Sequence, residues 1–289
     1  MLIRPRRTAA KPTVEPHAPR ALPERIRLVA VDLDGTLLCS KKQITRRTGR
    51  AISAARERGV RVVIASARPP RSVRHIHKAL GLDEWQINYN GALVWDEPAN
   101  RAILHRPLRG RLTQEMITLA RDQFEEVIVA CEILDQWWTD RHDRSHTTET
   151  GKLFSPDHVV PVEAICRQDV TKLMLLGEPP VLHRIEPMIV QAFGQRVSVV
   201  HTDRDLLQIM DNRASKGTAL RKVATHYGVP MEQTVVIGDA MNDLPMLAVA
   251  GYAIAMGNAH PAVQAAADWV APDNDQEGVL AALQHCGLC

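Results

Sequence analysis

The same alternation of short apolar runs and helix-forming segments occurs at both ends of the chain. Near the N-terminus, apolar runs at 26–32 and 61–66 alternate with helical patterns over 45–58 and 69–80. Short runs rich in β-branched residues are typical of strands that are buried on both faces of a parallel sheet. The strand, helix, strand order predicts right-handed crossovers, and Gly59 is predicted to end the first helix in a left-handed conformation.

The C-terminal part of the chain continues this pattern. Helical segments are predicted at 216–227, 243–249 and 261–267, and strands at 234–239 and 252–256. We therefore predict an α/β fold whose core is a doubly wound, Rossmann-like parallel sheet, assembled from residues 25–91 and 212–289.

The intervening segment, residues 92–211, mixes strands and helices without regular alternation, and its loops are longer and more polar. Strands are predicted at 126–131, 172–176, 197–201 and 206–210, and helices at 112–122 and 181–193. A segment of this length with its own strands and helices predicts a large inserted α+β cap domain.

Positive charge is concentrated at the start of the chain. Residues 1–24 are rich in proline and arginine without apolar periodicity, so we predict a disordered basic tail there. Residues 1–27 carry a net charge of +5 and the whole chain of 289 residues carries +3, so the remainder is close to −2. A nucleic-acid-binding domain carries its excess positive charge on a folded face. We therefore expect no nucleic-acid partner, whereas this charge leaves a small anionic substrate open.

The chain also lacks the signals of a membrane or secreted protein. No apolar run reaches the length of about 18 residues that a membrane span requires, so we expect no membrane partner. Five scattered cysteines and the lack of a signal peptide with an apolar segment predict a cytoplasmic location. Nothing in the sequence indicates an oligomeric state.

Acidic residues follow two of the predicted core strands. Asp32 and Asp34 come directly after the first strand, and Asp239 and Asp243 follow the strand at 234–238. Ligands of open α/β sheets bind at the carboxyl ends of the strands, and oxygen-only ligand sets suit Mg²⁺. Taken singly, each aspartate is equally consistent with a turn or a helix cap, and Gly35 suits a turn after Asp34. Their convergence on one sheet edge favours a magnesium site.

Two further polar residues are predicted at the same edge. Ser66 ends the second strand, and Lys216 begins a helix. Taken singly, the serine is also consistent with a helix cap and the lysine with a solvated surface group, without any role in chemistry. Phosphoryl transfer, however, needs a nucleophile, a cation on the phosphoryl oxygens and hydrogen-bond donors around them, and these residue types supply all three.

These residues resemble the four ordered motifs of the haloacid dehalogenase-like superfamily, in the spacing of its magnesium-dependent phosphatases. The motifs are Asp32-Leu33-Asp34-Gly35-Thr36-Leu37, then Ser66, then Lys216, then Gly238-Asp239-Ala240-Met241-Asn242-Asp243. The Cof-type branch is further indicated by Asn90-Gly91-Ala92, Ser215-Lys216-Gly217 and Met256-Gly257-Asn258-Ala259. The resemblance covers nearly all of the chain after residue 25.

The resemblance implies a role for each acidic residue. Asp32 would be the nucleophile that forms an aspartyl-phosphate, and its carboxylate would also bind Mg²⁺. Asp34 would act as general acid and then general base, with its backbone carbonyl on the metal ion. Asp239 would be the third protein ligand, and Asp243 would orient water on the ion.

The resemblance also implies how the substrate would be held. Ser66, Lys216 and Asn242 would bind the phosphoryl oxygens, and Arg68 and Asn90 are further candidate substrate-binding residues. The family usually has Thr-Gly-Arg at the second motif, where this chain has Ser66-Ala67-Arg68. Because alanine is strained at positive φ, we expect Ala67 to have a negative φ, which would leave activity intact.

The sequence therefore predicts a cytoplasmic Mg²⁺-dependent phosphatase of small organic phosphomonoesters, such as sugar phosphates or cofactor phosphates. The alternative is a non-catalytic sensor that binds a phosphorylated ligand in the same aspartate pocket. Asp34 favours the enzyme, because a protein that only stores an aspartyl-phosphate has no need of an acid or base that hydrolyses it.

Two other features favour structural roles. His142, His146 and His158 lie in a polar, loop-like region, and the third histidine is too distant from the other two for a typical zinc site. The doublet Trp137-Trp138 lies within the predicted cap and favours a core position over a substrate contact.

Overall fold

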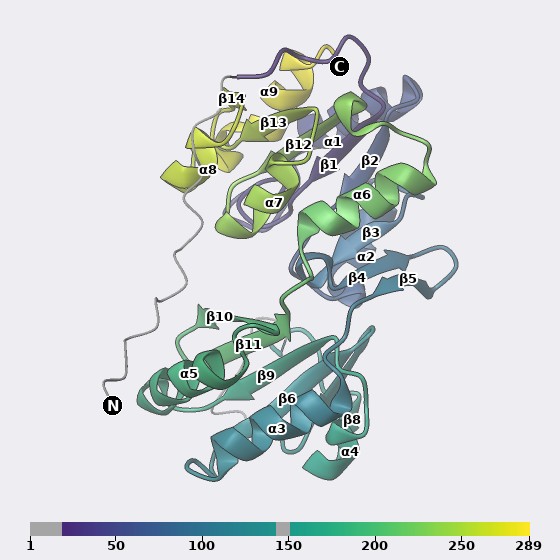
Figure 1. Cartoon of the computed structure of the whole chain (residues 1–289). Coiled ribbons are helices and arrows are strands. Elements are labelled where there is room, and N and C mark those ends of the chain that lie inside the picture. The colour runs from purple at the N-terminus through teal and green to yellow at the C-terminus, as the bar shows by residue number, and fades with distance from the viewer. Residues whose placement is uncertain (1–18, 143–150) are drawn as a thin grey trace.

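The computed structural model describes residues 19–142 and 151–289, which form two lobes joined by two connections (Figure 1). The core lobe contains a parallel sheet in the order β14-β13-β12-β1-β2. Its strands are β1 (Leu28–Val31), β2 (Arg61–Ile64), β12 (Thr234–Gly238), β13 (Tyr252–Ala255) and β14 (Trp269–Val270). The predicted Rossmann-like core is confirmed, because strands from both ends of the chain share one sheet.

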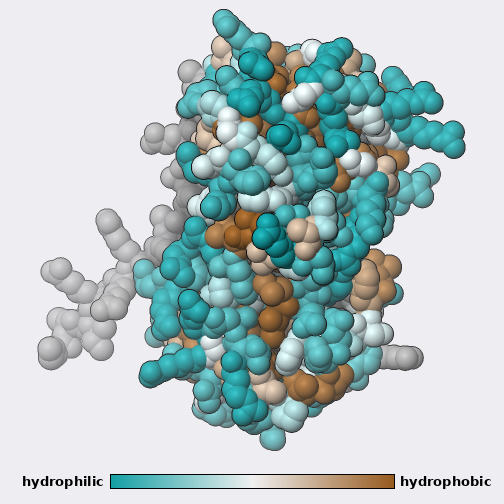
Figure 2. Space-filling view, turned by 90° about the vertical axis from the view of Figure 1, so that its right-hand side faces the viewer, coloured by the Kyte–Doolittle hydropathy of each residue, from teal (hydrophilic) through white to brown (hydrophobic). Residues whose placement is uncertain are grey.

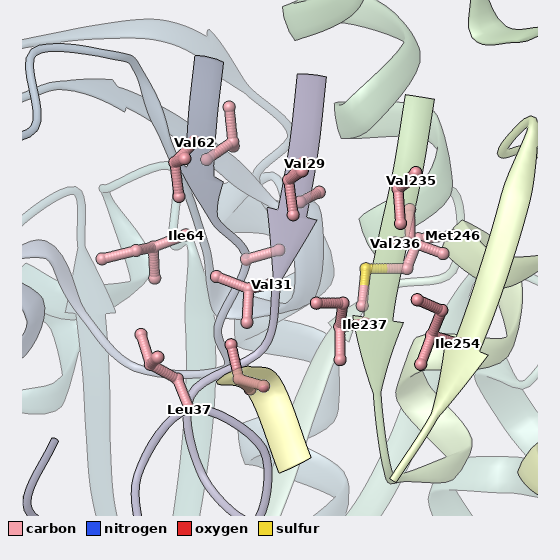
Figure 3. Close-up of a cluster of buried hydrophobic side chains, with 14 of the residues drawn as sticks. Val29, Val31, Leu37, Val62, Ile64, Val235, Val236, Ile237, Met246 and Ile254 are labelled. Atoms are coloured by element: carbon pink, nitrogen blue, oxygen red, sulfur yellow. The ribbon is translucent and has the colours of Figure 1, made fainter. Parts of the chain in front are cut away.

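Strand β1 lies inside this sheet, between β12 and β2, and it is buried along its whole length. Val31 pairs with Ile64 on one side and with Ile237 on the other. Figure 3 shows β-branched side chains from β1, β2, β12 and β13 meeting in one apolar cluster. This burial on both faces explains why the core strands read as continuous apolar runs.

The helices of the core lobe begin and end at residues that favour helix termini. The helices are α1 (Arg46–Glu57), α2 (Pro70–Ala79), α6 (Lys216–His226), α7 (Leu244–Leu247), α8 (Pro261–Ala265) and α9 (Gly278–His285). The Thr45 side chain accepts a hydrogen bond from the Thr48 amide at the start of α1, and Gly59 follows its end with a φ of +81°. Short 3₁₀ turns are η1 (Tyr89–Gly91), η2 (Met231–Gln233), η3 (Met241–Asp243) and η4 (Asn274–Gln276).

The cap lobe is a mostly antiparallel sheet with helices on one face (Figure 1). Its strands are β6 (Ile128–Ile133), β7 (Gln136–Thr139), β8 (His158–Val159), β9 (Lys172–Leu176), β10 (Val197–Asp203) and β11 (Leu206–Asp211). Its helices are α3 (Gly110–Arg121), α4 (Val162–Cys166) and α5 (Pro179–Phe193). Alternate residues of β9 point to the two faces of this sheet. Leu173 and Leu175 pack with the helices on one face, and Met174 lies in a separate cluster with Trp137 on the other.

A hairpin that the sequence patterns did not predict lies between the lobes in the chain. It consists of β4 (Leu93–Asp96) and β5 (Arg101–His105), and it pairs with β3 (Gln86–Asn88). Val94 packs in the core cluster, whereas Leu108 pairs with Val170 of the cap lobe. We therefore propose that the cap domain begins after His105, later than the expected boundary at residue 92.

The face of the molecule shown in Figure 2 is mainly hydrophilic, with hydrophobic groups gathered along the middle of the view. Among the described residues, no helix combines the length and the apolar character that crossing a membrane would require.

The predicted disordered tail needs a correction for residues 19–24, and residues 1–18 lie outside the described residues. Arg20 Nε lies 3.1 Å and 2.9 Å from the two carboxylate oxygens of Asp268. Its guanidinium also donates to the carbonyl oxygens of Ala250 and Leu247. The prediction was wrong here because Arg20 binds residues that follow it by more than 200 positions, which local composition does not reveal.

Replacing this arginine should destabilise the core lobe. Burial raises the pKa of Asp268, but hydrogen bonds from Arg20 outweigh that effect and hold the pKa below its usual value. Arg20→Ala should therefore lower the free energy of unfolding by about 1–3 kcal/mol at pH 7. A lowered carboxyl pKa contributes stability at neutral pH that is lost on acidification, so the difference should shrink below about pH 4.

Urea unfolding of wild type and variant at several pH values measures this difference. Arg25→Ala, at an exposed position nearby, is the control and should change stability by less than about 0.5 kcal/mol. Equal stability of the Arg20→Ala and Arg25→Ala variants would contradict an anchoring role.

Candidate active site

Three carboxylates meet where β1 and β12 end. Asp32 follows β1 and Asp239 follows β12, and these strands are neighbours in the sheet. Asp243 follows one turn later, in η3. One carboxylate oxygen from each of Asp32, Asp239 and Asp243 lies within 4.8 Å of the other two. The parallel topology thus brings together acids that are more than 200 positions apart in the sequence.

Lys216 lies between two of these acids. Its Nζ is 2.5 Å from Asp32 Oδ1 and 2.6 Å from Asp243 Oδ1, and its side chain is 0% exposed. The preceding residue, Ser215, caps α6 by accepting a hydrogen bond from the Thr218 amide, which places Lys216 in the first turn of the helix. The ammonium therefore enters the site from a fixed helix end.

The site has more negative than positive charge. Burial raises the pKa of Asp32 to about 8, an effect that Lys216 opposes and that the neighbouring Asp243 and Asp239 reinforce. Burial also raises the pKa of Asp239, which a hydrogen bond from the Thr36 hydroxyl at 2.7 Å partly offsets. Three carboxylates face one ammonium, and all the candidate ligand atoms are oxygens. This set fits a hard divalent cation such as Mg²⁺, whose charge would keep the acids ionised.

Asp243 is held rigidly in this arrangement. Its Oδ2 accepts hydrogen bonds from the backbone amides of Asp239 and Ala240, at 2.9 Å and 3.0 Å. Gly238 makes room for it, because a Cβ at this position would lie 2.7 Å from the Asp243 side chain. Asp243 thus connects Lys216 to the backbone that carries Asp239.

Asp34 lies beside the carboxylate cluster, and its side chain is bonded to two cations. Arg68 donates to both of its carboxylate oxygens, at 2.6 Å and 2.7 Å, and Lys42 Nζ lies 2.7 Å from Oδ1. Burial raises the pKa of Asp34, but these hydrogen bonds outweigh it, and the pKa lies below its usual value. Asp34 is therefore ionised in this state, with its side chain outside the cluster of three aspartates.

Two of the candidate phosphate-binding residues, Ser66 and Asn242, are connected through Asn90. Ser66 Oγ accepts a hydrogen bond from the Arg68 amide, and Ser66 O accepts one from the Asn90 amide. Asn242 Nδ2 donates to Asn90 Oδ1 at 2.8 Å. Ala67 is absent from the described residues with positive φ, so the expectation for its backbone is confirmed. Tyr89, Asn90 and Gly91, with φ of +47°, +53° and +93°, carry the left-handed conformations instead.

Three contacts at this site were not predicted. Thr36 holds Asp239, Lys42 pairs with Asp34, and Asn258 Nδ2 donates to the Gly35 carbonyl at 2.8 Å. Thr36 and Asn258 belong to the motifs quoted above, so the sequence indicated their positions but not their partners. Lys42 lies in a loop with a left-handed φ of +57°, and no sequence pattern marks its contact.

Residues 29–283 match the family model for haloacid dehalogenase-like hydrolases. The chain belongs to this family. A phosphatase of Bacillus subtilis is similar at 27% identity, over 90% of this chain and 99% of that protein. An HMP-PP phosphatase of Citrobacter koseri is 28% identical, over 81% of this chain and 85% of that protein. The crystal structure of a Thermotoga maritima protein aligns with a TM-score of 0.81 at 28% identity, covering 90% and 97% of the two chains.

These similarities confirm the predicted family, including its Cof-type phosphatase branch. They also confirm the predicted fold, a Rossmann-like core with an inserted cap. The chain is therefore an enzyme of the phosphoric monoester hydrolase class.

The remaining sequence features lie in the cap lobe of this hydrolase. Trp137 is buried in the cluster on the face opposite the helices, whereas Trp138 packs toward the helices. His142 contacts the Trp137 ring and His158 the Trp138 ring, so these two imidazoles contact opposite faces of β7. His146 lies outside the described residues.

The close approach of Gly35 to Asp239 provides a test of the site. A Cβ on Gly35 would lie 2.4 Å from Asp239 Oδ2, and the residue has a φ of +84°. Gly35→Ala should displace the Asp239 carboxylate and reduce phosphate release at least about tenfold, because misplaced catalytic groups lose rate steeply. Release is measured from p-nitrophenyl phosphate over a range of Mg²⁺ concentrations.

Gly59→Ala is the matched control, because Gly59 has a φ of +81° and no atom within 4 Å of the added Cβ. Both variants should lose about 1–2 kcal/mol of stability from the left-handed alanine. Only Gly35→Ala should lose activity. An equal activity of the two variants would show that Asp239 does not need its observed position.

Proposed function

We propose that this hydrolase is a Mg²⁺-dependent phosphatase that cleaves small organic phosphomonoesters, such as sugar phosphates or cofactor phosphates, through an aspartyl-phosphate on Asp32. The observation that carries the proposal is the position of Lys216 between Asp32 and Asp243, inside the cluster of three aspartates. A carboxylate nucleophile with a buried cation beside it is the arrangement that phosphoryl transfer requires.

Asp32 and Asp239 are the carboxylates proposed to hold Mg²⁺, together with the backbone carbonyl of Asp34. The bound ion would supply positive charge that stabilises the phosphoryl oxygens in the transition state. The excess of carboxylates over ammonium groups in the cluster supports this assignment. Thr36 keeps Asp239 oriented toward the cluster through its hydrogen bond.

In the proposed reaction an Asp32 oxygen attacks phosphorus, and the bond from phosphorus to the leaving-group oxygen breaks. Asp34 gives a proton to that oxygen and later removes one from the water that hydrolyses the acyl phosphate. Lys216, Ser66 and Asn242 hold the phosphoryl oxygens. Asp34 is ionised while Arg68 and Lys42 bind it, and because these contacts lower its pKa, both its role as acid and its strength as base require the two cations to turn away from it.

The proposal includes a small-molecule substrate and a cytoplasmic location. The similar proteins named phosphatases support the reaction class. All five cysteines are free thiols, which is typical of proteins from reducing compartments.

Asp32→Asn should abolish turnover while preserving the fold. The amide keeps the shape of the side chain and an oxygen that accepts from Lys216, but it is not a nucleophile. We expect the hydrolysis of p-nitrophenyl phosphate in the presence of Mg²⁺ to fall at least about 1,000-fold. EDTA should abolish wild-type turnover, and added Mg²⁺ should restore it.

Asp122→Asn, at the exposed end of α3, is the control and should keep wild-type activity. Circular dichroism and thermal unfolding establish that both variants are folded. Turnover of Asp32→Asn near the wild-type value would contradict a mechanism through an aspartyl-phosphate on Asp32.

The second candidate, a sensor that binds a phosphorylated ligand without hydrolysing it, is tested through Asp34. Asp34→Asn should lower kcat by about 100- to 10,000-fold, because the variant lacks the proton donor and acceptor. Single-turnover measurements of phosphate release, with the wild type in parallel, provide the rates. A wild type that binds phosphate esters without releasing phosphate would instead favour the sensor.

A further inference from the structure

The cap sheet presents one lysine to the core lobe. Lys172 is the first residue of β9, and its neighbour across the strand pair is Glu132 of β6. Leu173 packs with the cap helices, so Lys172 points to the opposite face of the sheet, as Met174 does. There its Nζ lies 5.2 Å from the centre of the Tyr89 ring, which belongs to the core lobe.

Lys172 is buried without an ion-pair partner among the described residues. The residue is 5% exposed, and burial lowers the pKa of its ammonium group, an effect that Glu132 offsets only in part. The Glu132 carboxylate is bonded elsewhere: Arg71 donates to both of its oxygens, at 2.8 Å and 2.9 Å, and the Tyr89 hydroxyl lies 3.1 Å from Oε2. No hydrogen bond joins the Lys172 ammonium to a described residue, so a bound anion would find it without a competing direct partner.

The lysine contacts a residue that is next in the chain to the phosphate-binding set. Tyr89, under its ammonium group, precedes Asn90, and Asn90 bonds to Asn242 in the phosphate-binding set. The leaving group of a phosphomonoester extends from the phosphoryl group, and the cap lobe contacts this part of the core where Glu132 and Lys172 meet Tyr89. An anionic group on the leaving group would therefore meet Lys172.

The residues around Lys172 suit the rest of such a molecule. Glu132 of β6 pairs with Lys172 of β9 on one side and with Trp137 of β7 on the other. The indole Nε1 of Trp137 is buried and has no hydrogen-bond partner among the described residues. Met210 of β11 contacts the cluster that contains Tyr89. The face thus combines the Lys172 ammonium, the Glu132 carboxylate that Arg71 neutralises, one indole N–H donor and apolar surface.

We propose that Lys172 is a specificity-determining residue that binds a carboxylate or second phosphate on the leaving group of the substrate. The inference rests on the proposed phosphatase function and narrows its substrates to those with a second anionic group. The competing interpretation is that Lys172 only balances the charge of Glu132. A residue with that role would affect stability but not the choice between substrates.

The test compares two phosphomonoesters that differ in one group. 3-Phosphoglycerate has a carboxylate where glycerol 3-phosphate has a hydroxymethyl group. The wild type should favour 3-phosphoglycerate by about tenfold or more, measured as kcat/KM or as competitive inhibition of p-nitrophenyl phosphate hydrolysis. Lys172→Met should lose this preference through a higher KM or inhibition constant, and Lys172→Arg should retain most of it.

Hydrolysis of p-nitrophenyl phosphate, whose leaving group has no second anionic group, should stay within about twofold of wild type in Lys172→Met. This substrate separates the two proposals, because wild-type protein that does not hydrolyse it would contradict the phosphatase function itself. Lys222→Met, at an exposed position of α6, is the control and should change neither preference nor turnover.

Two results would overturn the role of Lys172. One is a wild type that does not distinguish the two esters, a result that stands even if Lys172→Met fails to fold. The other is a Lys172→Met variant that folds, as judged by thermal unfolding, and keeps the full preference for 3-phosphoglycerate.

Discussion

The buried contact of Lys216 with Asp32 and Asp243 is the interaction on which the site depends. A lysine side chain that is 0% exposed needs carboxylate partners, and the two aspartates need a cation for the same reason. Asp32 follows β1 and Asp243 lies in the turn η3 after β12, so the contact is formed only when β1 and β12 are adjacent. The chemistry of this hydrolase is therefore a consequence of strand order, and a locally correct motif in another topology would not reproduce it.

Most of this core could be predicted from sequence because its signals are local. The runs at β1, β2 and β12 are apolar on both faces, and α1 and α6 have a threonine or serine at the N-cap. The same local signals located Asp32, Ser66, Asp239 and Lys216 at strand ends and a helix start. Their meeting followed from the general rule that parallel strands present their carboxyl ends at one edge of the sheet.

The features that the sequence did not reveal depend on partners distant in the chain. The hairpin β4–β5 joins the core because its strands pair with β3 and Val94 packs in the core cluster. Arg20 is ordered by Asp268, 248 positions away. Asp34 was predicted as an acid and base, but its pairing with Arg68 and Lys42 depends on the course of two loops. In each case the residue is visible in the sequence, but no local pattern indicates which distant residue it contacts.

The junction between the lobes connects the cap to the same edge of the core sheet. Arg71 of α2 binds Glu132 of β6 through two hydrogen bonds, and its backbone amide donates to Asp135 Oδ1 at 2.7 Å. A buried ion pair of this kind adds little net stability, because the loss of hydration offsets the attraction, but removing one partner leaves the other charge buried and unpaired. The pair therefore favours one placement of β6 on the core. Because β9 is paired with β6, that placement also sets the position of Lys172 above Tyr89.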